Sequence, residues 1–200
     1  SVQCLQAQSS ANIKYAADIE TIRKRVTDDL LQPSVEAEEM KKLAASITPD
    51  GSWPDINYKD VSRTGFQHSR HLQHMVDLGR AYKKSSSTLY KDASVKKAVS
   101  SALDFWLAND FICQNWWWNE MGTPNQMINT LLLLDTDLTE KQRVAGLKIA
   151  HRANLETFPA RPGGVLIQIA AMLGKHALFL RDADTLAKVI ELRNKAVANT

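Results

Sequence analysis

The sequence has 200 residues, of which 44% are hydrophobic and 24% are charged, and its formal net charge is +3. These proportions are those of an ordinary globular domain, so they exclude a disordered or collagen-like chain. The longest apolar stretch, Val165 to Leu173, is far shorter than the ~20 residues that cross a bilayer, so no membrane span is predicted.

Apolar residues recur three or four positions apart along most of the chain, which predicts helices, and no segment shows the alternation of a strand. The polar residues 1–10 are expected to form a frayed N-terminal segment, and residues 11–200 a single domain. The helices expected in chain order span residues 11–31, 34 or 36 to 47, 67–84, 93–109, 123 to at least 134, 139–154, 165–180 and 183–198.

Turn signals separate these helices. Residues 48–51, Thr-Pro-Asp-Gly, form a strong turn signal, and residues 111–122 are interpreted as a loop. Thr123 and Pro124 are typical of a helix N-cap followed by proline at the first helical position. The fifth and seventh helices are apolar on most sides, whereas the sixth and eighth are amphipathic. This alternation predicts an all-α fold of about eight helices, stacked as antiparallel hairpins in two layers, and leaves toroid and solenoid open.

Three consecutive tryptophans, Trp116 to Trp118, are the most informative feature of the sequence. Successive side chains point in different directions on a helix or a strand, so at least one of the three must face solvent, a cleft or a partner. An exposed indole could stack on a sugar ring, and the alternative is that the tryptophans fill a gap between helices. Asn115, Asn119 and Glu120 beside them could bind hydroxyl groups or cap the local backbone.

The charge and the titratable residues indicate partners only weakly. Ten Lys and Arg residues against four Asp and Glu follow from Lys141 onward, which suggests an acidic partner or simply solvated helix faces. His68, His71 and His74 recur every three residues, but such a row turns around the helix and converges poorly on a metal, so no metal site is predicted. No cofactor motif and no nucleic-acid-binding module is recognisable, and the two cysteines, Cys4 and Cys113, exclude a disulfide framework.

Several motifs together resemble the N-terminal helical domain of polysaccharide lyase family 8, which includes chondroitin AC, hyaluronate and xanthan lyases. Residues 115–124, Asn-Trp-Trp-Trp-Asn-Glu-Met-Gly-Thr-Pro, are similar to the family's Asn-Trp-Trp-x-x-Glu-Ile-(Gly/Ala)-Thr-Pro signature. Residues 49–53, residues 58–60 and the pair His71-Leu72 follow the family's order and spacing. The chain looks most like an enzyme of the chondroitinase AC type.

The resemblance implies an incomplete α/α toroid, with the rest of the toroid and the β-sandwich domains missing from this chain. It implies β-elimination of an anionic polysaccharide such as chondroitin sulfate or hyaluronan, without a cofactor, by a secreted or periplasmic enzyme. The family's catalytic His, Tyr, Arg and Glu would lie beyond this sequence, so no catalytic residue is assigned here. No signal peptide precedes Cys4, so it is absent or has been removed.

The substrate-binding residues that the resemblance implies are Trp116, Trp117 and Asn115. The family's catalytic Asn, which neutralises the uronate carboxylate, is expected between Ala160 and Leu166, where this sequence has no Asn. Arg161 is the candidate for binding the carboxylate instead. The alternative function is a non-catalytic glycan-binding or protein-interaction helical module. The uncovered end of an incomplete toroid also predicts self-association through the last two helices.

Overall fold

The computed structural model describes residues 10–153 and 164–198, and within these ranges all regular structure is helical. The predicted all-α class is therefore confirmed. The helices are α1 (Ser10–Lys14), α2 (Ala16–Leu31), α3 (Ala37–Ala45), α4 (His68–Lys83), α5 (Ala93–Asn109), the π-helix η1 (Trp118–Gly122), α6 (Thr123–Leu134), the 3-10 helix η2 (Asp135–Asp137), α7 (Glu140–Ala150), α8 (Gly164–Leu180) and α9 (Ala183–Ala198).

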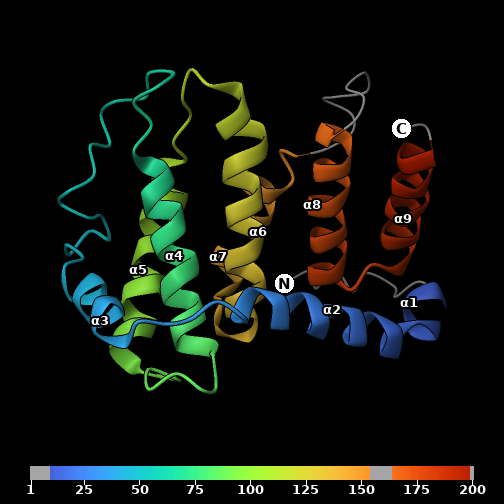
Figure 1. The fold of residues 1–200 in the computed structure, drawn as a ribbon, viewed down its shortest axis with the longest axis horizontal. Helices are drawn as coiled ribbons and strands as arrows, with labels where there is room; N and C mark the ends of the chain where they lie inside the picture. Colours follow the sequence, from blue (N-terminus) through green and yellow to red (C-terminus); the bar gives the residue numbers. More distant parts are fainter. Residues whose placement is uncertain (1–9, 154–163, 199–200) are drawn as a thin grey trace, which may run out of the picture.

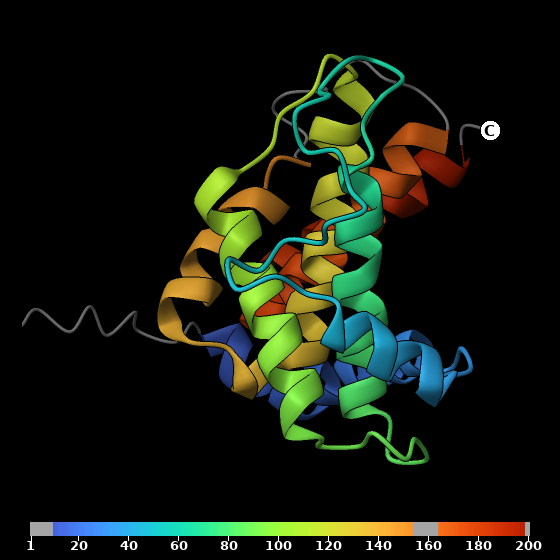
Figure 2. The same cartoon turned by 90° about the vertical axis from the view of Figure 1, so that its left-hand side faces the viewer.

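Three antiparallel pairs, α4 with α5, α6 with α7, and α8 with α9, build most of the molecule (Figure 1). In Figure 2, α4 and α6 form one layer, and α5 and α7 form the other. The first layer continues from α6 to α8, which pack directly against each other. The predicted two-layer stack of helical hairpins is thus observed, as in an incomplete α/α toroid.

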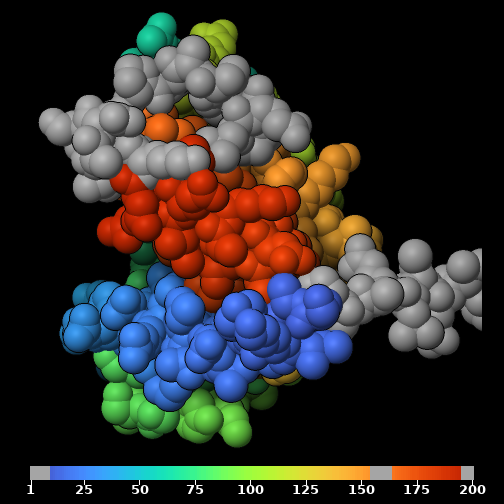
Figure 3. All heavy atoms as spheres, turned by 90° about the vertical axis from the view of Figure 1, so that its right-hand side faces the viewer, coloured from blue at the N-terminus to red at the C-terminus, as the bar shows by residue number. Residues whose placement is uncertain are grey.

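The single helix predicted over residues 11–31 is divided at Tyr15, which raises the helix count above eight. Tyr15 has φ −105° and ψ 13°, outside regular helical geometry. The bend lets α1 pack on α9 while α2 packs on α8. Figure 3 shows the N-terminal helices (blue) lying against the surface of α9 (red). The division therefore places both helices against the last hairpin.

Helix α2 runs across the ends of α6 and α8 and also contacts α4 (Figure 1), and polar contacts fix it there. The Arg80 Nε in α4 donates a hydrogen bond to the carbonyl oxygen of Leu30, at 2.8 Å. The Arg23 guanidinium forms an ion pair of 2.6 Å with Asp135, which follows α6. Helices α4, α6 and α8 all begin on the side of the molecule opposite to α2 (Figure 1).

The core lies between the two layers, and α6 passes through it. Only Asn125 and Gln126 of α6 are not buried, in agreement with the prediction that this helix is covered on several sides. Trp53 and Trp106 are 1% and 0% exposed and are among the largest core side chains. Burying an aromatic side chain contributes roughly 3 kcal/mol, so these residues anchor the irregular segment before α4 and the helix α5.

The predicted turn at residues 48–51 is confirmed, and it packs closely on α5. The amide of Gly51 donates to the carbonyl of Thr48 at 2.9 Å, and Asp50 accepts hydrogen bonds from Ser52. Gly51 has φ +91°, and a Cβ atom there would overlap the backbone oxygen of Ser101. Both facts require glycine at this position.

Gly51→Ala is therefore expected to lower the free energy of unfolding by about 2 kcal/mol, because alanine is strained at positive φ and would push α5 away. Gly174→Ala is the matched control: it lies within α8, its new Cβ would be 3.8 Å from Val189, and it should leave stability unchanged or raise it. Urea denaturation of both variants measures the difference. Equal stabilities would contradict this account of the turn.

Candidate functional site

The tryptophan segment forms the first turns of the helix that continues as α6. The predicted loop over residues 111–122 is therefore correct for residues 111–115 and wrong from Trp116 onward. Trp116 and Trp117 are already helical, and η1 follows them without interruption. Thr123 is consequently not an N-cap: it has φ −62° and ψ −49°, within the helix. Because the helix begins earlier than predicted, the three tryptophans are fixed by regular backbone geometry.

The π-helical turn has a local cause. The amide of Thr123 donates to the carbonyl of Trp118, five residues back, and Pro124 has no N–H with which to restore the ordinary spacing. The Trp118 ring packs over Gly122, where any Cβ atom would overlap it. Trp118 also contacts Phe66, with ring centroids 5.9 Å apart. This residue therefore supports the turn from the inside.

Two asparagines hold the segment in place through its backbone. The Asn119 Nδ2 donates to the carbonyl of Cys113 at 2.8 Å, and its Oδ1 accepts from the Cys113 amide at 2.9 Å. The Asn115 Oδ1 accepts from the amide of Trp117 at 3.1 Å. Of the two roles considered for these side chains, capping of the backbone is the one present here.

The other two tryptophans are accessible: Trp116 is 36% exposed and Trp117 is 41% exposed. The prediction that at least one of the three must face outward is therefore confirmed. The Trp117 ring is held edge-on to Trp118, with centroids 4.9 Å apart and an interplanar angle of 83°. An exposed indole supported in this way offers a rigid apolar surface to a ligand.

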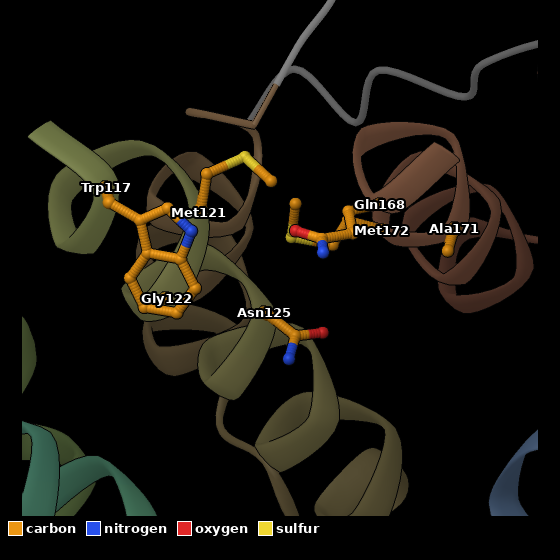
Figure 4. A pocket seen from close by; sticks show the side chains of 7 residues that line it. All are labelled: Trp117, Met121, Gly122, Asn125, Gln168, Ala171 and Met172. Atoms are coloured by element: carbon orange, nitrogen blue, oxygen red, sulfur yellow. The ribbon is translucent and has the colours of Figure 1, made fainter. Parts of the chain in front are cut away.

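Trp117 forms one wall of a pocket of about 310 Å³, which lies between the helical turns leading into α6 and the first half of α8 (Figure 4). Its lining residues are Trp117, Met121, Gly122, Asn125, Gln168, Ala171 and Met172. The indole and the two thioethers give apolar surface, and two amide side chains give hydrogen-bond donors and acceptors. This combination suits a sugar ring, which has an apolar face and a rim of hydroxyl groups.

The helix directions add a favourable field for anions. α4, α6 and α8 all begin on the side of the molecule where the pocket lies (Figure 1). The N-terminal end of a helix carries a partial positive charge. The pocket between α6 and α8 therefore lies on the side of the molecule where these helices begin, with Gln168, Ala171 and Met172 in the second and third turns of α8.

The histidine row serves the core. The His71 Nε2 donates to the carbonyl of Ala102 at 2.9 Å, so its Nδ1 accepts from the hydroxyl of Tyr58 at 2.8 Å. The same hydroxyl oxygen accepts from the amide of Trp53 at 3.1 Å. Burial lowers the pKa of His71 to about 4. His68 is also fully buried, and its Nε2 donates to the carbonyl of Tyr58.

The structure thus brings together Asn115, Trp116 and Trp117, but only Trp117 lines the pocket. Arg161 lies outside the described residues. Sequence reasoning missed the contributions of Asn125, Gln168 and Met172. The available signal was Gln168, a polar residue four positions before Met172 in a strongly apolar helix.

Comparison with known proteins places this fold. Residues 12–191 match the family described as polysaccharide lyase family 8, N terminal alpha-helical domain. Chondroitinase-AC of Pedobacter heparinus is 34% identical over 116 residues, which are 58% of this chain and 17% of that enzyme. A chondroitinase AC lyase solved in complexes with oligosaccharides superimposes with a TM-score of 0.75 and 29% identity, over 88% of this chain and 26% of that one.

More distant structures share the fold. Xanthan lyase of Paenibacillus has a TM-score of 0.70 at 19% identity, over 88% of this chain and 19% of that one. Chondroitin AC lyase of Streptomyces coelicolor A3, in complex with chondroitin sulphate, has a TM-score of 0.71 at 12% identity, over 90% of this chain and 27% of that one.

The stacked hairpins and their similarity to the chondroitinase AC structure define an α/α toroid domain of the polysaccharide lyase type. The chain belongs to polysaccharide lyase family 8 and corresponds to its N-terminal α-helical domain. It spans 17% of the length of the curated chondroitinase and 26% of the chondroitinase AC structure.

Proposed function

We propose that this chain is the substrate-binding helical part of a lyase that cleaves a uronic-acid-containing polysaccharide, chondroitin sulfate or hyaluronan, by β-elimination. The observation that carries the proposal is the pocket beneath Trp117, with its apolar wall and its two amides. Two relatives with the same fold are chondroitin AC lyases described with oligosaccharide or chondroitin sulphate bound.

In this division of labour, the chain holds the polymer and does not transfer the proton. β-Elimination needs a base that removes the C5 proton of the uronate and an acid that protonates the leaving oxygen at C4. None of the pocket's lining residues is titratable in the relevant range. Trp117 would stack on a sugar ring, Trp116 would extend the aromatic surface along the polymer, and Asn115 holds the Trp117 backbone.

The 200-residue chain alone is therefore expected to show little or no elimination, although it binds the polymer. Ultraviolet absorbance of the unsaturated uronate product measures the elimination. Fluorescence titration with chondroitin sulfate, hyaluronan and the neutral polymer dextran measures binding. Rapid product formation would contradict the proposed division of labour, and equal binding of dextran would contradict an anionic substrate.

The location and assembly of the protein belong to the same proposal. An enzyme that degrades an extracellular polymer would act as a secreted or periplasmic protein. Among the described residues, no helix is both long and apolar enough to cross a membrane. Self-association through the last hairpin stays a prediction: Leu180 and Ile190 are each 47% exposed there. Light scattering at several concentrations tests it, and a monomer at all of them would contradict it.

A further inference from the structure

A lysine that pairs with no carboxylate among the described residues lies next to the pocket. The Lys175 Nζ in α8 donates to the Oδ1 of Asn129 at 2.8 Å and approaches the Oδ1 of Asn125 at 3.4 Å. Both acceptors are neutral amides of α6. Within residues 10–153 and 164–198, no carboxylate forms an ion pair with this ammonium group, whereas Arg23, Lys83 and Arg152 each have one.

The lysine continues the face of α8 that forms the pocket. Gln168, Ala171 and Met172 line the pocket from this helix, and Lys175 lies one further turn along the same face. Asn125 joins the two features, because it lines the pocket and also contacts the lysine. In Figure 4 the Asn125 amide oxygen points towards α8. The positive charge therefore lies directly behind a polar wall of the pocket.

This arrangement is unfavourable in the protein without a bound ligand. Burial lowers the pKa of Lys175, and no charge among the residues that the structure describes opposes that effect. A partly buried ammonium group without a counter-ion loses hydration that two neutral amides replace only in part. It also has three N–H donors, of which two are directed at the amides. An oxyanion entering the pocket would supply the missing opposite charge and accept a hydrogen bond from the third N–H group of Lys175.

We propose that Lys175, together with Asn125, binds an oxyanion of the polysaccharide, a uronate carboxylate or a sulfate, at the end of the pocket away from Trp117. The proposal rests on the proposed function for the identity of the polymer. Its physical content, a binding position for an oxyanion between α6 and α8, can be tested separately. Trp117 would then contact the apolar face of a sugar ring, and Lys175 would bind a charged group on a neighbouring part of the same ligand.

The variant Lys175→Met removes the charge and keeps most of the aliphatic side chain. It is expected to weaken binding of a chondroitin sulfate tetrasaccharide, which carries both kinds of oxyanion, about tenfold, because a charge-assisted hydrogen bond is lost. Its melting temperature should be unchanged or higher, because the uncompensated, partly buried charge is gone. A purely structural lysine would give the opposite pattern, with lower stability and unchanged affinity. Lys97→Met in the outer helix α5 is the control with the same charge change on an exposed side chain.

Calorimetric titrations of the three proteins with unsulfated chondroitin and with chondroitin sulfate tetrasaccharides identify the oxyanion. A loss of affinity for both ligands assigns the carboxylate, and a loss for the sulfated ligand alone assigns the sulfate. Equal affinities of Lys175→Met and wild type for both ligands would overturn the proposal while leaving the proposed function intact.

A second measurement tests the oxyanion position independently of whether the chain binds a polysaccharide. Sodium glucuronate should raise the melting temperature of the wild type and of Lys97→Met more than that of Lys175→Met. If this difference appears while no polysaccharide binds, the oxyanion position stands and the proposed function fails. If glucuronate stabilises all three proteins equally and no polysaccharide binds, both proposals fail.

Discussion

Trp117→Ala is expected to weaken binding of a chondroitin sulfate oligosaccharide by roughly tenfold to a hundredfold, the range typical of removing a central aromatic contact. The indole is 41% exposed and forms a wall of the pocket, so its truncation removes the flat surface on which a sugar ring would stack. Trp116→Ala should have a smaller effect, because Trp116 is exposed but does not line the pocket. Isothermal titration calorimetry measures both affinities without depending on tryptophan emission.

Two controls make this prediction specific. Tyr90→Ala truncates an aromatic side chain of similar exposure, 43%, between α4 and α5 at the opposite end of these helices, and it should leave the affinity unchanged. Trp118→Ala should mainly lower the melting temperature, because its ring supports η1 against Phe66 and Gly122. An unchanged affinity of Trp117→Ala would show that the polymer binds elsewhere.

The second large effect is a loss of stability in acid that arises from His71. Its pKa is about 4 in the folded protein, against 6.5 for an unperturbed histidine, because burial disfavours the charged ring. Between these values the unfolded chain binds more protons than the folded one, so acid favours unfolding. The stabilisation is complete above pH 6.5 and is lost as the pH falls towards 4, amounting to roughly 3 kcal/mol. Burial also lowers the pKa of His68 and His74, which adds to the effect in the same direction.

Denaturant unfolding at a series of pH values measures this dependence. His71→Gln should flatten the slope between pH 6.5 and 4, although the variant is less stable at pH 8. Tyr58→Phe removes the hydroxyl that His71 accepts from but leaves the histidine in place, so the slope should persist. Asp137, whose pKa is lowered to about 2 between Lys83 and Lys96, loses its contribution only below this window. Parallel profiles for His71→Gln and the wild type would contradict the assignment to His71.

The helices could be predicted where the spacing of the apolar residues and the capping or turn residues indicate the same helix ends. The predicted range 93–109 is the observed α5, whose start is fixed by Asp92 accepting hydrogen bonds from the next amides. The predicted range 183–198 is likewise the observed α9. In both cases an aspartate directly before the helix, Asp92 or Asp182, accepts hydrogen bonds from amides of the first turn, and such capping depends on nearby residues.

The tryptophan segment could not be predicted in the same way. Its asparagines and its proline are typical of a loop, and the helical backbone depends on the Trp118 ring packing over Gly122 and on Asn119 bonding to Cys113. The pocket depends on more distant packing, since Gln168 and Met172 meet Asn125 only when α8 lies beside α6. The tryptophans of the candidate site could be predicted from the sequence. The positions of its amide side chains and of Lys175 depend on how α6 and α8 pack.

The most direct test of the central claim follows the five indole N–H signals by NMR while a chondroitin sulfate tetrasaccharide is added. The signal of Trp117 is predicted to shift in a saturable way, while the signals of the buried Trp53 and Trp106 stay in place as internal controls. Binding that saturates while the Trp117 signal does not move would contradict the proposal that this pocket holds the polysaccharide.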